Sequence, residues 1–595
     1  MGLDYRATAC PPNYVAGYVI RPMTPAASPE TIRSWRRAVQ AAFRRGVGPS
    51  IGRRSGGEMM SRLIPARLVG GQMVRPWTAT AGATILALVM TSCGGDPPSA
   101  TLDTTASPSA VPTSSDDSAS SAAQNCERLA EAGLETVAAI SAELVTSGSA
   151  AGESGLPEFC RVALTVDPAI NIEVWLPTDN YNHRFQAMGN GGYAGQISYW
   201  GMADALRAGY ATASTDTGHA GEDFDGSFAL TADGALDMPL IEDFAARSLI
   251  ELTDVSRSLI EAFYGEPADY AYWNGCSTGG RQGMLLAQRH PEGYDGILAA
   301  APAINWDRFL PSLLWAQVVM EEELGRPIEG CKLAAATAAA VEACDAVDGV
   351  SDGVLGDPTA CGVDPASLIG VDTPCGEVTP ADAAVIQAIW NGPRTVDGEF
   401  LWYGLAPGAP LEAVAGSIPF PIGLDYHATW VQQDPSFDWH SLGYAGFEEA
   451  HRTSQDLFHD VIGTDDPDLG SFRDAGGKLL MWHGWYDELI PPQGSIDYYE
   501  RVLETMGGTG EVAEFARLYM APGVFHCEGG LGATQFDAFG ALVDWVESGE
   551  APDTIPASPA GVDAATRILC PYPLVATYDG TGDPERAASF TCNAE

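Results

Sequence analysis

Two short segments, far apart in the chain, together contain the residue types needed for nucleophilic catalysis. The first is Asn274-Gly275-Cys276-Ser277-Thr278-Gly279-Gly280, and the second is Phe525-His526-Cys527. The pattern Gly-x-Ser-x-Gly is typical of a serine held on a sharp turn between a strand and a helix. A histidine can then take the serine proton. One cysteine precedes the serine and another follows the histidine, so a disulfide between them would link nucleophile and base.

The residues around Ser277 predict the strand, turn and helix that this motif requires. Apolar residues at helical spacing predict a helix over 244–263. Glycine and proline at 265–267 end that helix, and an aromatic-rich strand follows over 269–273. Gly275 and Gly279 flank the turn, where a side chain would collide with a neighbouring element. A helix then continues through 284–288 and points its amino-terminal end at the serine.

Asp487 is the predicted acid and His526 the predicted base. Residues 477–484 and 517–520 have the composition of strands, and Asp487 and His526 follow them in loops. Catalytic loops lie at the carboxyl ends of strands in such folds, and the order Ser, Asp, His is that of α/β-hydrolases. His483 is the alternative base, but it lies only four residues from Asp487, so we interpret it as a residue that structures the loop. The alternative for Asp487 is a turn former or an ion-pair partner.

An acyl transfer of this kind also needs two backbone N–H groups directed at the developing oxyanion. One is predicted from Thr278, the residue after the nucleophile. The other is predicted from the glycine-rich loop that follows an apolar run at 185–188. Gly192 is the first choice and Gly191 the second, and an ordinary glycine turn is the alternative interpretation of this loop.

These motifs resemble the tannase and feruloyl esterase family, which includes the mono(2-hydroxyethyl) terephthalate hydrolase of plastic-degrading bacteria. The resemblance rests on Gly-Cys-Ser-Thr-Gly-Gly, the downstream His-Gly-x-x-Asp and the pair His-Cys, and it covers about residues 125–595. It implies an α/β-hydrolase core with a large lid inserted before the acid. It further implies a triad of Ser277, Asp487 and His526 above a disulfide between Cys276 and Cys527.

The cysteines indicate an oxidising compartment. Two of the twelve, Cys10 and Cys93, precede the expected folded region, and the other ten include no Cys-x-x-Cys pair. An even number without that spacing favours disulfides over zinc. Their pairing cannot be derived from the sequence, because ten thiols allow about 945 combinations. The resemblance implies the pairs Cys126–Cys160, Cys276–Cys527, Cys331–Cys344, Cys361–Cys375 and Cys570–Cys592.

An acidic, glycine-rich run at 345–357 is a candidate calcium site. Calcium prefers carboxylate and carbonyl oxygens on a tightly turning loop, although the spacing here is not that of an EF-hand. A solvated acidic turn is the alternative. The resemblance implies a structural calcium ion in the lid, held by the carboxylates of Asp345, Asp348 and Asp352 and the carbonyls of Val350 and Val354. No organic cofactor is expected.

The amino-terminal region has the features of an export signal. Arginines precede an apolar run at 78–90, which is too short to span a bilayer but suits a signal-peptide core. Val89-Met90-Thr91-Ser92-Cys93 resembles a bacterial lipobox, so lipidation of Cys93 in the cell envelope is expected, with ordinary secretion as the alternative. Residues 1–92 are therefore treated as a leader, and Met59, Met60 or Met73 could be the true start.

The rest of the chain divides into a tether, a core and a lid. Residues 93–124 are rich in Ser, Thr, Ala, Asp and Pro and predict a disordered tether. The core is predicted at 125–305 and 475–595, and the lid at 306–474. Seven aromatic residues of the lid are candidates for its own core or for contact with an aromatic acyl group, with Tyr426 and Trp430 considered first because of their i, i+4 spacing. The others are Trp315, Trp390, Trp402, Tyr403 and Trp439.

The charge of the chain limits its partners. The whole sequence has a formal net charge of −47, and residues 93–595 hold 19 basic and 75 acidic residues, or −56 without the leader. Such a surface disfavours nucleic acid and anionic membranes. A membrane contact is therefore expected only through a lipid at Cys93, and the oligomeric state is not predicted.

Together these features predict a serine carboxylesterase that acts on esters of hydroxycinnamic or hydroxybenzoic acids through an acyl-enzyme. The resemblance also allows a terephthalate-monoester hydrolase, which uses the same framework. A lipid-anchored binding protein that has the hydrolase fold without activity is the alternative from another class. Loss of a triad residue would favour it, and all three residues are present.

Overall fold

A computed structural model of the protein describes residues 115–562 and 564–594. The leader at 1–92 and the candidate lipidation residue Cys93 lie outside the described residues. The first described element is helix α2 (Ser115–Leu129), so residues 115–124, which were predicted to belong to a disordered tether, are helical. The carboxyl-terminal part of α2 packs on the core through Cys126 and Leu129, both buried, and this tertiary contact overrides the polar composition.

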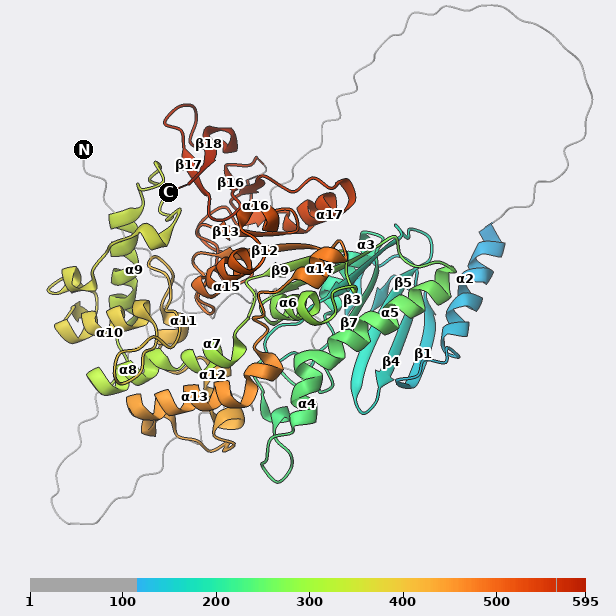
Figure 1. Cartoon of the computed structure of the whole chain (residues 1–595), viewed down its shortest axis with the longest axis horizontal. Helices are drawn as coiled ribbons and strands as arrows, with labels where there is room; N and C mark the ends of the chain where they lie inside the picture. The colour runs from blue at the N-terminus through green and yellow to red at the C-terminus, as the bar shows by residue number, and fades with distance from the viewer. Residues whose placement is uncertain (1–114, 563, 595) are drawn as a thin grey trace, which may run out of the picture. The chain divides into compact units, whose positions relative to one another are not determined.

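The core is built on a nine-stranded mixed sheet (Figure 1). Antiparallel pairing joins β1, β4, β5 and β7, whereas the six strands from β7 to β13 in the sheet are parallel. In sheet order the strands are β1 (Val137–Val145), β4 (Phe159–Val166), β5 (Ile170–Pro177), β7 (Ala211–Thr215), β6 (Arg184–Met188), β8 (Tyr270–Cys276), β9 (Gly296–Ala300), β12 (Lys478–Gly484) and β13 (Ala516–Ala521).

The register aligns the carboxyl ends of four strands at one edge of the sheet. Cys276 of β8 pairs with Ala300 of β9, and Ala300 pairs with Trp482 of β12. Gly484, at the end of β12, pairs with Ala521, at the end of β13. The loops that follow β8, β12 and β13 therefore begin side by side, as the chemistry predicted for them requires.

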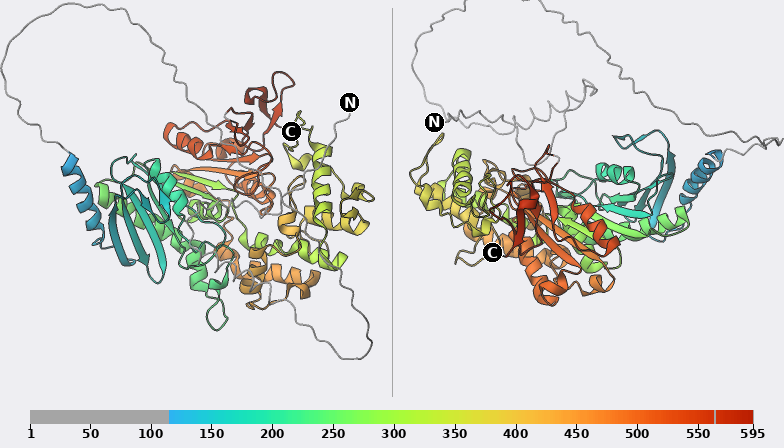
Figure 2. Two further views of the ribbon diagram at one scale, coloured as in Figure 1. Left: turned by 180° about the vertical axis from the view of Figure 1, so that it is seen from behind. Right: turned by 90° about the horizontal axis from the view of Figure 1, so that it is seen from above.

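Helices cover both faces of the sheet, because successive side chains of a strand point to opposite faces. On one face Leu479 and Met481 pack with α5 (Ser248–Tyr264), α6 (Thr278–Arg289) and α15 (Gln493–Thr505). On the other face Leu480 and Trp482 pack with α17 (Ala538–Ser548), and farther along the sheet α3 (Tyr199–Arg207) covers the same side (Figures 1 and 2). Helix α5 ends at Gly265, whose φ of 83° is a conformation that glycine adopts readily.

The lid is inserted between β9 and β12, which are neighbours in the sheet but far apart in the sequence. This confirms an α/β-hydrolase core with a lid inserted before the acid. The insertion contains α7 (Trp306–Ser312), α8 (Trp315–Leu324), α9 (Gly330–Cys344), α10 (Pro380–Asn391), α11 (Glu412–Ala415), α12 (Pro421–Asp425), the π-helix η5 (Tyr426–Val431) and α13 (Gly443–Ile462). Helix α14 (Gly470–Asp474) was predicted to belong to the lid, but its Phe472 packs into the core cluster.

The remaining elements are short. They are the π-helix η2 (Asp243–Arg247); the helices α4 (Met238–Glu242) and α16 (Thr509–Val512); the 3₁₀ turns η1 (Ser227–Ala229), η3 (Pro358–Ala360), η4 (Pro365–Leu368), η6 (Trp439–Ser441) and η7 (Ala587–Ser589); and the small strands β2 (Ser149–Ala150), β3 (Glu153–Ser154), β10 (Asp372–Thr373), β11 (Gly376–Glu377), β14 (Gln535–Phe536), β15 (Ile555–Ser558), β16 (Arg567–Leu569), β17 (Val575–Tyr578) and β18 (Phe590–Asn593).

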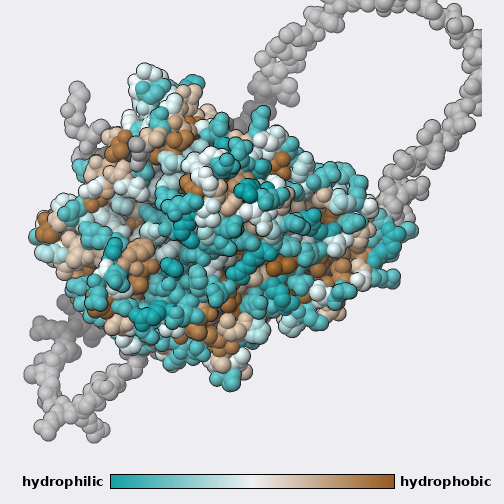
Figure 3. Space-filling view, in the orientation of Figure 1, coloured by the Kyte–Doolittle hydropathy of each residue, from teal (hydrophilic) through white to brown (hydrophobic). Residues whose placement is uncertain are grey.

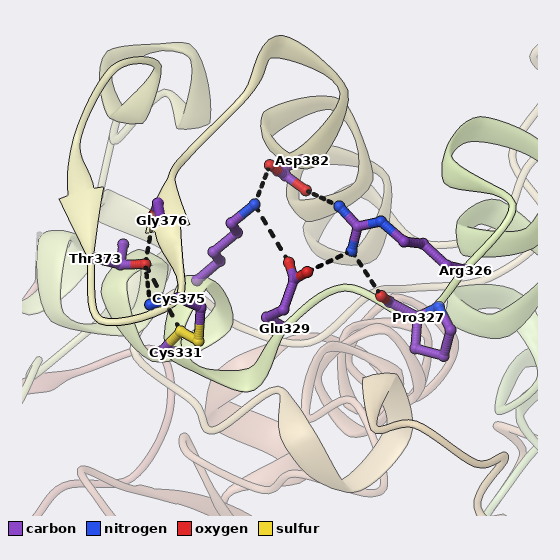
Figure 4. The surroundings of a disulfide bond; sticks show 9 residues. Arg326, Pro327, Glu329, Cys331, Thr373, Cys375, Gly376 and Asp382 are labelled. Atoms are coloured by element: carbon purple, nitrogen blue, oxygen red, sulfur yellow. Dashed lines mark hydrogen bonds and ion pairs between the residues drawn. A yellow bond between two sulfur atoms is a disulfide. The ribbon is translucent and has the colours of Figure 1, made fainter. Parts of the chain in front are cut away.

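A buried ion pair between Lys332 and Asp382 joins α9 to α10 in the lid, and the more exposed Glu329 and Arg326 extend it into a network (Figure 4). Lys332 Nζ lies 2.7 Å from Asp382 Oδ2 and 3.2 Å from Glu329, and Arg326 also pairs with Glu329 at 2.8 Å. The Asp382 side chain is fully buried. It also accepts a hydrogen bond from the main-chain N–H of Thr379, the N-cap residue of α10. Removal of one partner from such a buried pair costs about 3–5 kcal/mol, so this network fixes how the two helices pack.

The described residues form five disulfides, and three of them are the expected ones: Cys126–Cys160, Cys276–Cys527 and Cys570–Cys592. The two expected pairings within the lid were wrong, because Cys331 bonds to Cys375 and Cys344 bonds to Cys361. Cys331 and Cys344 lie at opposite ends of α9. Because they are thirteen positions apart in the helix, their Cα atoms are about 20 Å apart, whereas bonded cysteines have Cα atoms within about 7 Å.

One face of the described residues is largely polar. Hydrophilic residues cover most of the face in Figure 3, and hydrophobic residues occur there in scattered patches. A search of the described helices finds none with the length and apolar character needed to cross a bilayer.

Candidate active site

Ser277 lies on a strained turn between β8 and α6. Its φ of 63° and ψ of −124° are rare for a residue with a side chain, and such strain concentrates at functional sites. The glycines on either side allow the close approach that this turn needs. A Cβ atom on Gly275 would lie 2.4 Å from the Gly279 carbonyl oxygen, and one on Gly279 would lie 3.0 Å from that of Asn190. The structure therefore forms the strand, turn and helix predicted for a nucleophile elbow.

Asp487 and His526 meet across the loops that follow β12 and β13. His526 Nδ1 lies 2.8 Å from Asp487 Oδ2, and the Asp487 side chain is fully buried. The main-chain N–H groups of Leu489 and Ile490 donate to the other oxygen, Oδ1, at 2.9 and 2.8 Å. Because Asp487 accepts the Nδ1 proton, a neutral His526 ring has a free lone pair on Nε2, and this is the atom that can take a proton.

Each of these two groups favours the charged form of the other. Burial by itself would raise the pKa of Asp487, but the charge of His526 and the hydrogen bonds from His483 and His526 hold that pKa well below its usual range. Burial would likewise lower the pKa of His526, but the nearby carboxylates of Asp487 and Glu488 raise it above its usual value. The site is therefore arranged to stabilise an imidazolium next to a carboxylate.

His483 is held within the acid loop, as we interpreted it from the sequence. Its Nε2 lies 3.0 Å from Asp487 Oδ2 and 3.1 Å from the Ile490 carbonyl oxygen, and its Nδ1 lies 2.8 Å from Ser495 Oγ. Both neighbours of Nε2 are acceptors, so that nitrogen carries a proton, and the ring is fully buried. His483 thus contacts the same Asp487 oxygen as His526 does and helps to orient that carboxylate.

The disulfide Cys276–Cys527 brings the predicted nucleophile and base together. Its two Cα atoms are 5.8 Å apart, and it joins residues that are 251 positions apart in the sequence. One of these cysteines directly precedes Ser277 and the other directly follows His526. The structure thus places the main chains of the nucleophile turn and the base loop in adjacent positions.

Removing this disulfide is expected to reduce activity far more than it changes the fold. In the double variant Cys276→Ala/Cys527→Ala, we expect kcat to fall at least about 100-fold, because a misplacement of about 1 Å can cost that much. Unfolding free energy should fall by about 2–5 kcal/mol. The checks are the hydrolysis rate and thermal unfolding. The variant Cys570→Ala/Cys592→Ala, which removes a disulfide away from the site, is the matched control. Full activity of the first variant would contradict a catalytic role for the bond.

The predicted oxyanion residues are hydrogen-bonded to each other. Thr278 Oγ1 donates to the Gly192 carbonyl oxygen at 2.6 Å. Thr278 is in the first turn of α6, where backbone N–H groups have no intrahelical partner. Gly192 has a φ of 51°, and a Cβ atom there would lie 2.2 Å from the Asp223 carbonyl oxygen. The glycine-rich loop thus reaches the start of α6, where backbone N–H groups are available.

The two lid aromatics considered first for substrate contact are core residues instead. Tyr426 and Trp430 are both fully buried, and the Tyr426 hydroxyl lies 2.7 Å from Ser454 Oγ. Trp430 stacks on Tyr193, with ring centroids 5.9 Å apart. Both residues lie in the π-helix η5 and pack on Phe458, with ring centroids 6.1 Å from it for Tyr426 and 5.2 Å for Trp430. Trp430 contacts the loop of Gly192 through Tyr193, the residue that follows Gly192.

The acidic lid loop binds its own backbone. Asp345 Oδ1 accepts the N–H groups of Asp352, Gly353 and Val354 at 3.2, 2.8 and 3.1 Å. Burial, together with the neighbouring carboxylates of Asp352 and Asp345, raises the pKa of Asp348 to about 6. The hard oxygen donors suit calcium. However, no group of three or more His, Cys, Asp or Glu side chains within 115–562 and 564–594 is arranged to hold a metal ion.

Glu488 is a residue of this region that sequence analysis did not identify. It follows Asp487 directly, and only 5 % of its surface is exposed. Its Oε2 accepts the main-chain N–H of His526 at 3.1 Å. A charged residue between Asp487 and the apolar pair Leu489-Ile490 was the signal available in the sequence.

The mixed sheet has a serine on a strained turn after β8 and a buried carboxylate bonded to a histidine at the ends of β12 and β13, which is the arrangement of an α/β-hydrolase. Comparison with known proteins gives the family. A profile described as tannase and feruloyl esterase matches residues 154–421 and 422–593. The chain is 41 % identical over 461 residues to a probable feruloyl esterase of Arthroderma benhamiae, covering 73 % of this chain and 86 % of that protein. An uncharacterized esterase of Xanthomonas campestris is 32 % identical over 540 residues, covering 79 % and 92 %.

Solved structures agree with this result. The crystal structure of feruloyl esterase B from Aspergillus oryzae matches with a TM-score of 0.70 at 26 % identity, covering 79 % of this chain and all of that one. Tannin acyl hydrolase from Aspergillus niger matches with a TM-score of 0.70 at 25 % identity, covering 80 % and 94 %. The chain belongs to the tannase and feruloyl esterase family and is an esterase. The five disulfides within residues 115–594 suit an oxidising, extracellular environment.

Proposed function

We propose that the protein hydrolyses esters of hydroxycinnamic or hydroxybenzoic acids through an acyl-enzyme formed on Ser277. The observation that carries the proposal is the contact between His526 Nδ1 and the buried Asp487 carboxylate. The loop of His526 is joined by a disulfide to the Ser277 turn. The family of the chain and the names of its relatives support the substrate class. In this scheme Ser277 is the nucleophile, His526 the general base and acid, and Asp487 the group that orients the ring.

In the first half-reaction His526 Nε2 takes the proton from Ser277 Oγ as that oxygen attacks the ester carbonyl carbon. The N–H groups of Thr278 and Gly192 stabilise the negative charge on the carbonyl oxygen. The protonated His526 then gives its proton to the departing alcohol. In the second half-reaction His526 takes a proton from water, the hydroxide attacks the acyl carbon, and Ser277 regains its proton as the aromatic acid leaves.

Hydrolysis assays on three esters test the proposal. We expect methyl ferulate or methyl gallate to be hydrolysed with a higher kcat/KM than a terephthalate monoester. The Ser277→Ala variant gives the background rate. A clear preference for the terephthalate monoester would assign the chain to that activity instead. No turnover of any of the three by folded protein would favour the binding-protein alternative.

We also propose that a calcium ion stabilises the lid, held by the carboxylates of Asp345, Asp348 and Asp352 and the carbonyls of Val350 and Val354. Such an ion supplies positive charge to a crowded acidic loop, and its role is structural because the loop is not part of the hydrolytic site. We further propose that the chain is exported, either with a lipid on Cys93 or by ordinary secretion. That region lies outside the described residues.

Chelation tests the calcium proposal. Treatment with EGTA is expected to lower the melting temperature by several degrees, and added calcium should restore it, because an ion that binds only the folded state stabilises that state. Asp348→Asn should reduce the response to calcium. Asp397→Asn, an exposed aspartate of the lid, should respond like the unmodified protein. An unchanged melting temperature with EGTA would show that no such ion is bound.

A further inference from the structure

A second buried carboxylate contacts the base loop, and the reaction scheme above does not use it. Asp487 binds the His526 ring at Nδ1, whereas Glu488 accepts the His526 main-chain N–H at 3.1 Å. Two consecutive carboxylates of one loop thus hold the same histidine at two points. Burying a carboxylate costs free energy unless the group is hydrogen-bonded or paired, so a glutamate that is only 5 % exposed at this position needs a reason.

We propose that Glu488 is a positioning residue of the hydrolytic reaction, which fixes the main chain of His526 and adds a second negative charge beside the imidazolium. The inference rests on the proposed function of Ser277, Asp487 and His526. It assigns Glu488 no contact with substrate. Its effect reaches the reaction only through the location and the proton affinity of His526.

The position of Glu488 explains how one side chain can have both effects. The His526 ring is attached to the main-chain atoms that Glu488 holds, so loss of that hydrogen bond frees the base loop near its catalytic residue. The neighbouring Cys527 has a φ of 63°, which shows that the loop turns sharply at this point. The disulfide fixes one side of His526, and Glu488 fixes the His526 amide itself.

The charges around Glu488 set the direction of its electrostatic effect. Burial and then the charge of Asp487 raise the pKa of Glu488, whereas His526 lowers it. Both carboxylates raise the pKa of His526, and His483 lies beyond Asp487 and contacts its Oδ2. At a pH where Glu488 is ionised, it therefore favours protonated His526, and removing its charge should make His526 lose its proton at lower pH.

Two substitutions separate the positional effect from the electrostatic one. Glu488→Gln keeps an oxygen acceptor for the His526 N–H but has no charge, and Glu488→Ala has neither. Glu528→Gln is the matched control, since it removes the charge of an exposed glutamate two residues from His526. The readout is the rate at which a fluorophosphonate labels Ser277 between pH 5 and 9, with kcat/KM for methyl ferulate as a second measurement.

For Glu488→Gln we expect the labelling rate at the plateau of the pH profile to stay within about threefold of that of the unmodified protein. The acid limb of the profile, where the rate falls as His526 becomes protonated, should be displaced to lower pH by about half a pH unit or more. For Glu488→Ala we expect a plateau rate at least about tenfold lower, as misplacement of a catalytic group predicts. Glu528→Gln should leave both quantities unchanged.

The inference is overturned if Glu488→Gln leaves the acid limb in place, or if Glu488→Ala labels Ser277 at the unmodified rate. A glutamate with only a structural role would lower the melting temperature of both variants without changing either readout. Failure of the proposed function gives a different result, because the unmodified protein itself would then form no adduct on Ser277.

Discussion

Ser277→Ala is expected to lower kcat by about 10⁴- to 10⁶-fold while the protein remains folded. The serine oxygen forms the bond to the acyl group in the proposed reaction, and alanine has no atom that can replace it. Activity that remains comes from substrate binding and from the oxyanion hole. The measurements are single-turnover hydrolysis of methyl ferulate and thermal unfolding. Ser258→Ala, which removes an exposed hydroxyl from α5, is the matched control and should have normal activity.

Strain at this position leads to a second expectation for the same residue. Because Ser277 has a φ of 63° and a ψ of −124°, alanine inherits the strain, whereas glycine relieves it. We therefore expect Ser277→Gly to be equally inactive but more stable than Ser277→Ala by about 1 kcal/mol. Equal stability of the two variants would show that the serine turn stores no strain. Substantial hydrolysis by either variant would rule out Ser277 as the nucleophile.

Asp487→Asn is expected to lower kcat by about 10⁴-fold at neutral pH. The fully buried carboxylate accepts the Nδ1 proton of His526, and an amide can present its N–H instead and so favour the wrong tautomer. Because Asp487 raises the pKa of His526, its loss should also lower that pKa. The acid limb of kcat/KM should therefore move to lower pH in the variant. A pH–rate profile of both proteins measures the two effects together.

The control for this variant is Asp553→Asn, since the Asp553 side chain is 97 % exposed and lies outside the site. It should retain normal kinetics. Stability gives an independent check, because the pKa of Asp487 is lowered in the folded protein. The stability that Asp487 contributes to the folded protein is present above its unfolded-state pKa of about 3.9. It is lost as the pH falls toward the lower pKa that Asp487 has in the folded protein. Asp487→Asn should therefore lose stability at neutral pH and show a weaker loss on acidification than the unmodified protein.

Local sequence patterns were sufficient to predict the elements that carry Ser277, Asp487 and His526. A strand followed by Gly-x-Ser-x-Gly, and strands followed by single polar residues, depend on periodicity and turn chemistry over short windows. The order of these residues along the chain then limited the fold to an α/β-hydrolase. The positions of Cys276 and Cys527 beside Ser277 and His526 raised the possibility of a disulfide there, but the pairing itself was implied only by the resemblance to the tannase and feruloyl esterase family.

Features that depend on tertiary packing could not be predicted in this way. The pairing of Cys331 and Cys344 was wrong because the length of α9 between them became known only with the structure. Residues 115–124 were predicted to be disordered from their composition, yet they belong to a helix that packs on the sheet.

The environment of the side chains around the site could not be predicted from the sequence either. Tyr426 and Trp430 were considered as substrate contacts, but both are fully buried in the hydrophobic cluster of the lid. Glu488 was overlooked because a glutamate beside a predicted catalytic aspartate has the composition of an ordinary solvated loop. Only the burial of its side chain and its bond to the His526 amide distinguish it.

The most direct test of the account is to treat the folded protein with a fluorophosphonate and locate the adduct by peptide mass spectrometry. The account predicts a single modified residue, Ser277, and a labelling rate that falls at least about 10³-fold in His526→Ala, since the base that activates the hydroxyl is then absent. An adduct on another serine, or labelling of Ser277 that is equally fast without His526, would contradict it.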